Sequence, residues 1–176
     1  VVLLNRVKAH TSFKGKIESG LLKMSVIGLG KQKGAEVCHE LGFERMERSI
    51  EEIARVVLSS MPIVFGVALI ENGKHETAEI HVIPTEEIEE REPALLARAN
   101  ELMARVPFKE LEAIIIDRIG KDISGTGLDT NVVGRYHTGQ GSGGPSVTRI
   151  SVLDITETSH GNGNGLGIAD FTTRRV

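Results

Sequence analysis

The chain has 176 residues, 40% hydrophobic and 26% charged, which is ordinary for a globular protein with a sizeable core. A net charge of −3, with 3% aromatic residues and no tryptophan, argues against nucleic-acid or membrane-surface binding. The single cysteine excludes an internal disulfide framework and fits a reducing, cytoplasmic compartment, and no apolar run approaches the ~20 residues of a membrane span.

The chain begins with an apolar run and continues into a long basic segment. Residues 1–7, "VVLLNRV", are typical of a buried strand. They start without a methionine or a polar lead-in, so we expect the central to C-terminal part of a longer two-domain protein whose N-terminal domain is missing. The basic, glycine-rich stretch 8–34 follows, and residues 32–41 predict a short helix.

A helix and a hairpin come next. Ser49 is predicted to begin the helix, because "SIEE" matches a capping box and apolar residues then recur at helical spacing until Pro62. The runs "IVFGVALI" and "TAEIHVI" flank "ENGKHE", in which Asn72-Gly73 is typical of a hairpin turn. Two strands joined by this turn are therefore expected.

The second half of the chain adds a helix and two more strands. Pro93 is placed to be the first residue of the helix. "LEAIIIDRIG" predicts a buried strand that ends at Asp117, and "VTRISVLDI" predicts another. Helices and strands mix, which indicates an α/β fold, with α+β as the alternative: a mixed sheet with flanking helices and long Gly-rich functional loops. We expect residues 1–176 to form one compact unit, with a candidate internal boundary near residue 62.

Three Gly-rich stretches stand out by their length: 8–34, 121–146 and 156–167. Loops longer than ~12–15 residues are uncommon unless they are functional or disordered. These stretches hold many of the histidines and acids of the chain, so we expect functional residues in them.

The spacing Gly28-x-Gly30-x-x-x-Gly34, with Lys31 and Lys33 inside it, is typical of a glycine turn that cradles a phosphate at a helix N-terminus. A dinucleotide-binding fold would need a second strand here, and "FERMERS" is no strand. The order "KGA" also reverses the Gly-Lys-Ser/Thr of a P-loop. The alternative is a glycine turn that only packs the helix.

The histidines and acids allow several interpretations. His10 follows a strand end, where functional side chains collect. His39 lies in an expected helix beside Cys38, where a lone histidine is more often structural than a ligand. The other histidines divide into two open loop candidates, His137 and His160, and two that we expect to be structural, His75 and His81.

Hydrolase and simple metal sites find less support. Ser19-Gly20 lacks the G-x-S-x-G context of a nucleophile, and one cysteine with scattered histidines does not make a structural zinc site. Asp117, Asp122 and Asp129 could bind a hard metal ion, although their spacing matches no EF-hand loop.

Three segments resemble the lactate racemase family, whose members use a nickel-pincer nucleotide: "NRVKAHTSFKGKIESGLLKMSVIGLGKQKGAEVCHELGF", "DRIGKDISGTGLDTNVVGR" and "TSHGNGNGLGIADFTTRR". The last two look like segments of one uncharacterised branch, and the resemblance covers nearly the whole chain. It implies an isomerase, a racemase or epimerase of a small 2-hydroxy acid, with nickel in a covalently attached nickel-pincer nucleotide. The isolated chain could lack the cofactor, and a homo-oligomer is compatible with the resemblance.

The resemblance also implies roles for individual residues. In the family a lysine is linked covalently to the cofactor and a histidine 16 residues later binds nickel, and Lys23 and His39 stand at that interval. His10 fits a histidine that acts in acid/base catalysis, although it lies 13 residues before Lys23, farther than expected for the lactate enzyme. The family's second catalytic histidine and substrate-binding arginine would lie upstream of Val1. The cofactor phosphate would be served by the glycine–lysine stretch: Gly28, Gly30, Lys31 and Lys33.

The chemistry suits these residue types. Proton removal from the carbon of a 2-hydroxy acid would place a carbanion beside a carboxylate, whereas a hydride route avoids this. A base takes the hydroxyl proton as hydride leaves, and hydride returns to the other face of the 2-keto acid. A histidine of pKa about 6.5 suits that proton transfer, and nickel accepts imidazole. The lysine must lose its proton to attack, so we expect crowding by Lys16, Lys31 and Lys33 to lower its pKa.

The loop "GKDISGTGLDTNVVGR" is expected to close over the site with its polar residues Lys121, Asp122, Asp129, Asn131 and Arg135. Arg135 is our choice for an anionic partner, because a guanidinium fork matches a carboxylate or phosphate; the alternative is a subunit or domain contact.

Two other functions stay open. One is a non-catalytic or cofactor-carrying protein. The other is a phosphate- or hydroxyacid-processing metalloenzyme that would use Asp117, Asp122, Asp129 and His160.

Overall fold

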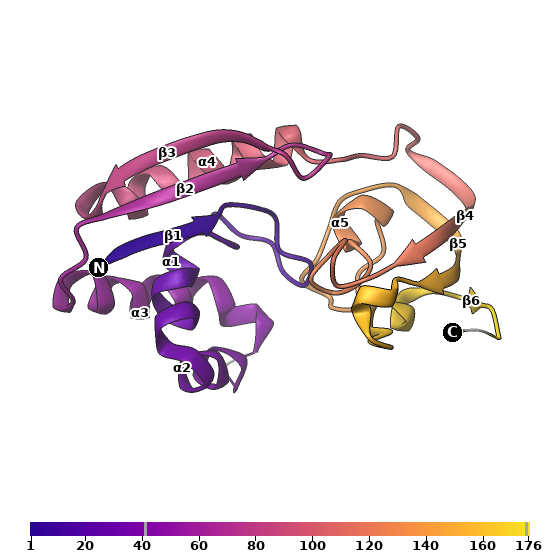
Figure 1. The fold of residues 1–176 in the computed structure, drawn as a ribbon, viewed down its shortest axis with the longest axis horizontal. Helices are drawn as coiled ribbons and strands as arrows, with labels where there is room; N and C mark the ends of the chain where they lie inside the picture. The colour runs from indigo at the N-terminus through magenta and orange to yellow at the C-terminus, as the bar shows by residue number, and fades with distance from the viewer. Residues whose placement is uncertain (41, 175) are drawn as a thin grey trace. The chain divides into compact units, whose positions relative to one another are not determined.

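The computed structural model describes residues 1–40, 42–174 and 176, without the side chain of His39. Helices and strands mix in an α/β fold (Figure 1). The chain divides into two compact units, Val1–Ala104 and Arg105–Val176, and not into the single unit expected. Residue 62 lies inside the first unit, because β1 (Val2–Arg6) and β2 (Phe65–Glu71) pair across it. No helix in the described ranges is long and apolar enough to cross a membrane.

The first unit is a mixed sheet with helices packed on one face. The strand order is β1-β2-β3, with β1 parallel to β2 and β2 antiparallel to β3 (Thr77–Pro84). The crossover between the parallel strands carries α1 (Leu21–Lys23), α2 (Leu29–Glu40) and α3 (Met46–Ser60), and α4 (Ile88–Leu102) follows β3. Both α1 and α4 reach Gly66 of β2 through Leu21 and Ile88, so they share a face of the sheet.

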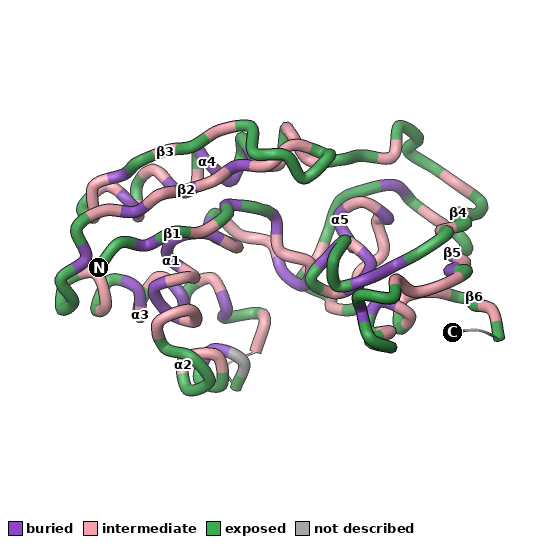
Figure 2. Tube along the Cα trace, viewed as in Figure 1, coloured by how far each residue is buried: buried purple, intermediate pink, exposed green. Residues whose placement is uncertain are grey.

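Burial alternates along β2 (Figure 2), and the strands of this sheet carry apolar residues on both faces. Leu3 and Ile83 flank Gly66 in register and are buried beneath the helices. Leu4 and Val82 flank Val67 on the other face, where they are 56% and 60% exposed. The prediction of a buried strand at residues 1–7 therefore holds for one face only.

Two helices begin earlier than predicted. Ser49 lies inside α3, which starts at Met46, and no side chain caps its first turn. Met46 is 2% exposed, so its burial anchors this turn and outweighs the capping-box pattern. Similarly, α4 starts at the fully buried Ile88, upstream of Pro93, which lies inside the helix.

The hairpin predicted at Asn72-Gly73 is confirmed between β2 and β3. Asn72 Oδ1 accepts hydrogen bonds from the backbone N–H groups of Lys74 at 2.9 Å and Glu76 at 3.1 Å. The asparagine side chain thus organises the turn, which is why the sequence pattern is informative there.

The second unit is built on a parallel sheet in the order β4-β5-β6: β4 (Glu110–Ile119), β5 (Ser146–Ile155) and β6 (Phe171–Thr172). The short helix α5 (Thr130–Val133) lies in the connection between β4 and β5. The prediction of a buried strand ending at Asp117 is wrong, because β4 runs on to Ile119 and Ile115 is 71% exposed. The core of this unit covers one face of the sheet, around Ile150 and Val152.

Candidate functional site

Lys23 stands at the start of a continuous helical segment in the first unit. The segment begins with α1 at Leu21, passes through a π-helical stretch at Met24–Gly28 and enters α2. One side of this segment is buried through Leu21, Leu22 and Val26. Short π-helical stretches within α-helices are frequent at functional sites.

Burial lowers the pKa of Lys23, and the nearby charge of Lys8 lowers it further, while Cys38 acts in the opposite direction. Lys8 belongs to the loop before the helix, which closes where the Lys8 N–H donates to Ser19 O at 2.9 Å. The direction of the shift agrees with the expectation, but burial and Lys8 cause it. The lysines expected to crowd Lys23 are all exposed: Lys16, Lys31 and Lys33. A lowered pKa favours the free amine, the form that attacks an electrophile.

A buried carboxylate from α4 caps the helix that carries Lys23. Glu92 Oε2 accepts the backbone N–H groups of Leu21 at 2.7 Å and Leu22 at 3.0 Å, and Glu92 is 1% exposed. Gly20 makes room for it, because a Cβ there would lie 2.5 Å from the carboxyl carbon. Burial raises the pKa of Glu92 to about 7, although both N–H bonds act to lower it.

Sequence reasoning missed Glu92, although a signal was present. Glu92 shares the apolar helical face of Leu95, Leu96 and Ala99, all of which are buried. An acidic side chain on a buried apolar face is costly unless it forms hydrogen bonds with a buried partner. Here the partner is backbone from a distant part of the chain.

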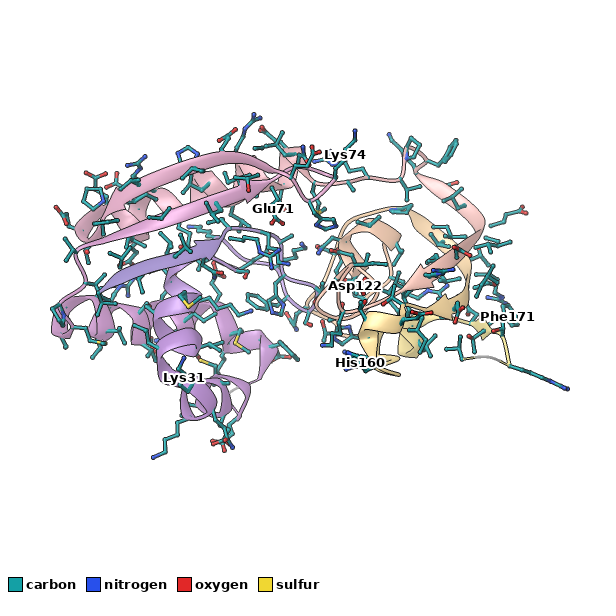
Figure 3. All side chains as sticks on the ribbon, in the orientation of Figure 1. Lys31, Glu71, Lys74, Asp122, His160 and Phe171 are labelled. Atoms are coloured by element: carbon teal, nitrogen blue, oxygen red, sulfur yellow. The ribbon has the colours of Figure 1, made fainter. Side chains whose placement is uncertain are left out.

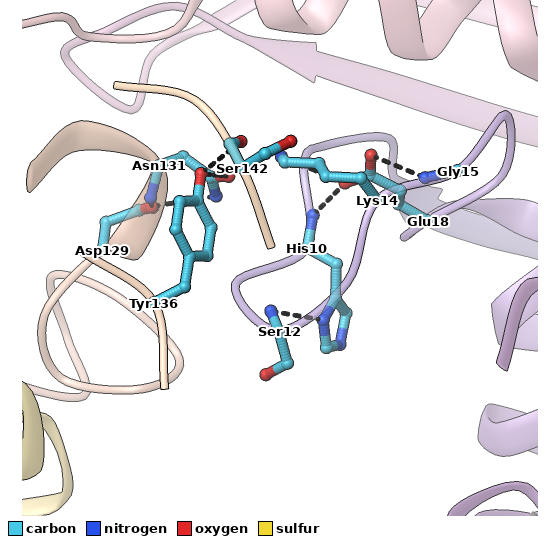
Figure 4. A network of polar contacts seen from close by, with 9 residues as sticks. All are labelled: His10, Ser12, Lys14, Gly15, Glu18, Asp129, Asn131, Tyr136 and Ser142. Carbon is cyan, nitrogen blue, oxygen red and sulfur yellow. Dashed lines mark hydrogen bonds and ion pairs between the residues drawn. The ribbon is translucent and has the colours of Figure 1, made fainter. Parts of the chain in front are cut away.

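His10 lies in a loop that a second buried carboxylate organises (Figure 4). Glu18 is 3% exposed and accepts the backbone N–H groups of His10 at 2.5 Å and Gly15 at 3.3 Å. Its carboxylate also lies 3.6 Å from the Lys14 ammonium. Burial raises the pKa of Glu18 in spite of these partners. The Glu18 side chain, which belongs to the same loop, therefore fixes the backbone that positions His10.

The ring of His10 has a defined tautomer. Its Nδ1 accepts the Ser12 N–H at 3.1 Å, and the ring lies 4.5 Å, centroid to centroid, from that of the buried Phe13 (Figure 4). A backbone N–H can only donate, so Nδ1 carries no proton and the neutral ring carries it on Nε2. Neutral His10 can therefore donate a proton from Nε2, and its role in acid/base catalysis stays a prediction.

The glycine–lysine stretch contains a break in the helix. Lys31 has φ +53° and ψ −141° within α2, so helical backbone starts afresh after it (Figure 3). Gly30 faces open space, and Lys31 and Lys33 are exposed. Gly34 packs closely, because a Cβ there would collide with the carbonyl oxygen of Val26. Gly34 thus fits the packing interpretation, and the open turn with its two cations fits the phosphate interpretation.

His39 belongs to α2, but its side chain lies outside the described residues, so its role as a nickel ligand stays a prediction. Its neighbour Cys38 is fully buried, and burial raises the pKa of the thiol. Among the side chains that the structure describes, no group of three or more His, Cys, Asp or Glu could hold a metal ion.

In the second unit, three expected site residues hold their own loops together. The Lys121 ammonium donates to the Gly125 carbonyl at 2.6 Å, and Asp129 caps α5. Asp122 Oδ1 accepts the Thr156 hydroxyl at 2.5 Å, which lowers the pKa of Asp122. These bonds favour a structural role for all three.

The other loop candidates do not gather into one cluster. Asp117 is exposed on β4, and His160 is exposed after a short turn, with φ +48° (Figure 3). His137 is exposed in the connection after α5.

The guanidinium of Arg135 is used inside the second unit. Nη1 donates to Ile168 O at 3.0 Å and to Asp170 Oδ2 at 2.5 Å. Nη2 donates to Val147 O at 3.1 Å and Thr148 O at 3.0 Å. Arg135 therefore ties its loop to β5 and to the segment before β6. These contacts favour a structural role over the expected anion clamp, and they lie within one unit.

Comparison of the chain with protein-family models, curated proteins and solved structures found no match. The functional argument therefore depends on the residues themselves. The first unit brings Lys8 and Cys38 close enough to Lys23 to shift its pKa, and it fixes the nearby loop and helix with Glu18 and Glu92.

We predict that Gly34→Ala lowers the free energy of unfolding by about 1–3 kcal/mol, because the added methyl group must displace the Val26 backbone. Gly30→Ala is the matched control, since its Cβ meets open space, and it should stay within about 0.5 kcal/mol of the parent. Urea denaturation of both variants measures the difference. Equal losses in the two variants would contradict this packing role.

We predict that the first unit loses stability as the pH rises from about 4.5 to about 7. Glu92 has an ordinary pKa of 4.5 and a pKa of about 7 in the fold, so the folded state binds its proton more tightly. The stabilisation is fully present below the lower value and lost through the upper one, on the order of 3 kcal/mol in all. Glu18, whose pKa is also raised, adds in the same direction.

Denaturation curves across this pH range, compared with those of Glu92→Gln, isolate the contribution of Glu92. The variant should show a flatter profile, whereas Glu90→Gln, an exposed site on the same helix, should keep the parent slope. A parent slope in Glu92→Gln would show that another group causes the pH dependence.

Proposed function

We propose that the chain acts in the racemisation or epimerisation of a small 2-hydroxy acid by hydride transfer, with a covalently attached nickel-pincer nucleotide, in the cytoplasm. The observation that carries the proposal is Lys23, a partly buried amine of lowered pKa at the start of the helix that leads into the glycine–lysine turn. The resemblance of the quoted segments to the lactate racemase family supplies the reaction class.

The residues present fit the proposed cofactor at two points. The free amine of Lys23 would form the covalent link, because burial and Lys8 both favour its unprotonated form. The open turn at Gly30, with the exposed Lys31 and Lys33, would bind the phosphate. His39 would ligate the nickel, sixteen residues after Lys23. When bound, the cofactor supplies an acceptor and donor of hydride.

His10 would handle a proton at the substrate oxygen. With Nδ1 occupied by the Ser12 N–H, the neutral ring offers its Nε2 proton, which suits the return of a proton to the oxygen as the alcohol is restored. Removal of the hydroxyl proton then requires a second group, or a shift of the proton within the His10 ring. In the family that the quoted segments resemble, a second catalytic histidine would be that group.

The two alternatives differ in what supports them. A non-catalytic carrier would share the Lys23 attachment and lack turnover. A metalloenzyme centred on Asp117, Asp122, Asp129 and His160 gains no support, because Asp122 and Asp129 hold loops and Asp117 and His160 are exposed.

Coexpression of the full protein with the enzymes that make the cofactor tests the attachment. We expect intact mass to show one adduct, peptide mapping to place it on Lys23, and metal analysis to find nickel. Lys23→Arg should lose the adduct and Lys16→Arg, at an exposed site, should keep it. His39→Ala should keep the adduct and lose nickel. An adduct on another lysine would refute this assignment.

We predict that His10→Ala keeps adduct and nickel but slows turnover by about 10²–10⁴, the range typical of a general acid–base group. Chiral chromatography of short 2-hydroxy acids, starting with L-lactate, measures turnover. His75→Asn is the control, because His75 is exposed in the hairpin turn with φ +62°, which asparagine tolerates. If His10→Ala turns over as fast as the parent, His10 takes no part in proton transfer.

A further inference from the structure

We propose that Glu92 is a positioning residue for Lys23: it holds the first turn of the helix on which Lys23 stands and so keeps the amine in its partly buried position. Only the role of the Lys23 amine as the point of cofactor attachment depends on the proposed function. The contact itself joins two distant parts of the chain, since Glu92 lies 71 residues after Leu21.

The first turn of this helix has no other cap of its own. Its N-cap residue is Gly20, which has no side chain to accept a hydrogen bond. Leu21 and Leu22 are 0% and 1% exposed, so water cannot replace the acceptor that Glu92 Oε2 provides for their N–H groups. A buried N–H without an acceptor is costly, so loss of Glu92 should open the turn.

The same turn is also held from the sheet. Asn5 of β1 donates from Nδ2 to Gly20 O at 2.8 Å, so a strand and a helix fix the residues just before Lys23 from two sides. Asn5 donates to the N-cap carbonyl of Gly20, which also accepts the Met24 N–H at 3.0 Å, whereas Glu92 accepts the otherwise unpaired N–H groups of the first turn. Of the two, Glu92 therefore controls the geometry of the turn that carries the amine.

The second oxygen of Glu92 argues against a role in stability alone. Oε1 is buried and has no hydrogen-bond partner among the described residues. A buried carboxyl with an unused oxygen costs free energy, and a neutral amide could accept the same two N–H groups without burying an ionisable group. The carboxyl is explained if its task is to hold the turn and not to maximise stability.

The effect of Glu92 on Lys23 is one of position and not of direct charge. Burial, Lys8 and Cys38 are the causes of the shift at Lys23, and burial with two backbone bonds causes that at Glu92. The amide of a glutamine can replace the acceptor, whereas a methionine keeps the volume and offers no comparable acceptor. The two substitutions therefore separate position from charge.

The test is trace acetylation of the cofactor-free protein with acetic anhydride over a series of pH values, read for each lysine by peptide mass spectrometry. In the parent, Lys23 should react with a midpoint below that of the exposed Lys33. In Glu92→Met the Lys23 midpoint should rise toward that of Lys33, and amide exchange at Leu21 and Leu22 should accelerate on the order of tenfold. Glu92→Gln should restore both readouts to the parent values.

Glu90→Met is the matched control, an exposed glutamate on the same helix, and should leave the Lys23 midpoint unchanged. If Glu92→Met does not fold, Gly20→Ala takes its place, because the added Cβ pushes the carboxyl away from the turn. A folded Glu92→Met or Gly20→Ala with the parent midpoint overturns the proposal. A shift in Glu92→Gln as large as in Glu92→Met also overturns it, in favour of charge. The assay uses no cofactor, so its outcome is independent of whether an adduct forms on Lys23.

Discussion

The segment between β1 and α2 depends on hydrogen bonds that backbone N–H groups donate to buried carboxylates. Glu18 binds two N–H groups of the loop that carries His10, and Glu92 binds two at the start of the helix that carries Lys23. Neither segment has enough regular structure to satisfy these donors by itself. The two carboxylates therefore accept backbone N–H groups that would be paired in a regular helix or sheet. Burial raises the pKa of both carboxyl groups.

The topology of the first unit explains why these segments meet. Parallel pairing of β1 and β2 requires a crossover, and α1 to α3 form it on one face of the sheet. His10 follows the carboxyl end of β1, and Lys8 pairs with Ser19 just before the helix begins. In α/β sheets the carboxyl ends of parallel strands are the usual place for ligand sites. The candidate site follows that rule on a sheet with only one parallel pair.

Local sequence patterns predicted which helices and strands form better than they predicted where each begins or which residues it contacts. Apolar runs and Asn72-Gly73 were sufficient to find the strands and the hairpin, because strand preference and turn chemistry act locally. The starts of α3 and α4 were misplaced because burial of Met46 and Ile88, set by tertiary packing, outweighs capping and proline preferences. At the site, candidate residues such as Lys23 and His10 could be named from the sequence. The residues that contact them could not, because a contact such as that of Glu92 with Leu21 joins residues 71 positions apart.

Both units have groups whose pKa is shifted by hydrogen bonds, such as Glu79 in the first, but they differ in the shifts that burial causes. Where burial is the main cause of a pKa shift among the described residues, the group lies in the first unit: Glu18, Lys23, Cys38 and Glu92. In the second unit Asp122 and Asp170 are shifted by hydrogen bonds that favour their charged forms. Bonds of the second kind stabilise a fold, whereas burial of an ionisable group costs stability and is typical of sites that need altered reactivity. That contrast supports the proposed site around Lys23, whereas the shifted acids of the second unit hold the loops of that unit together.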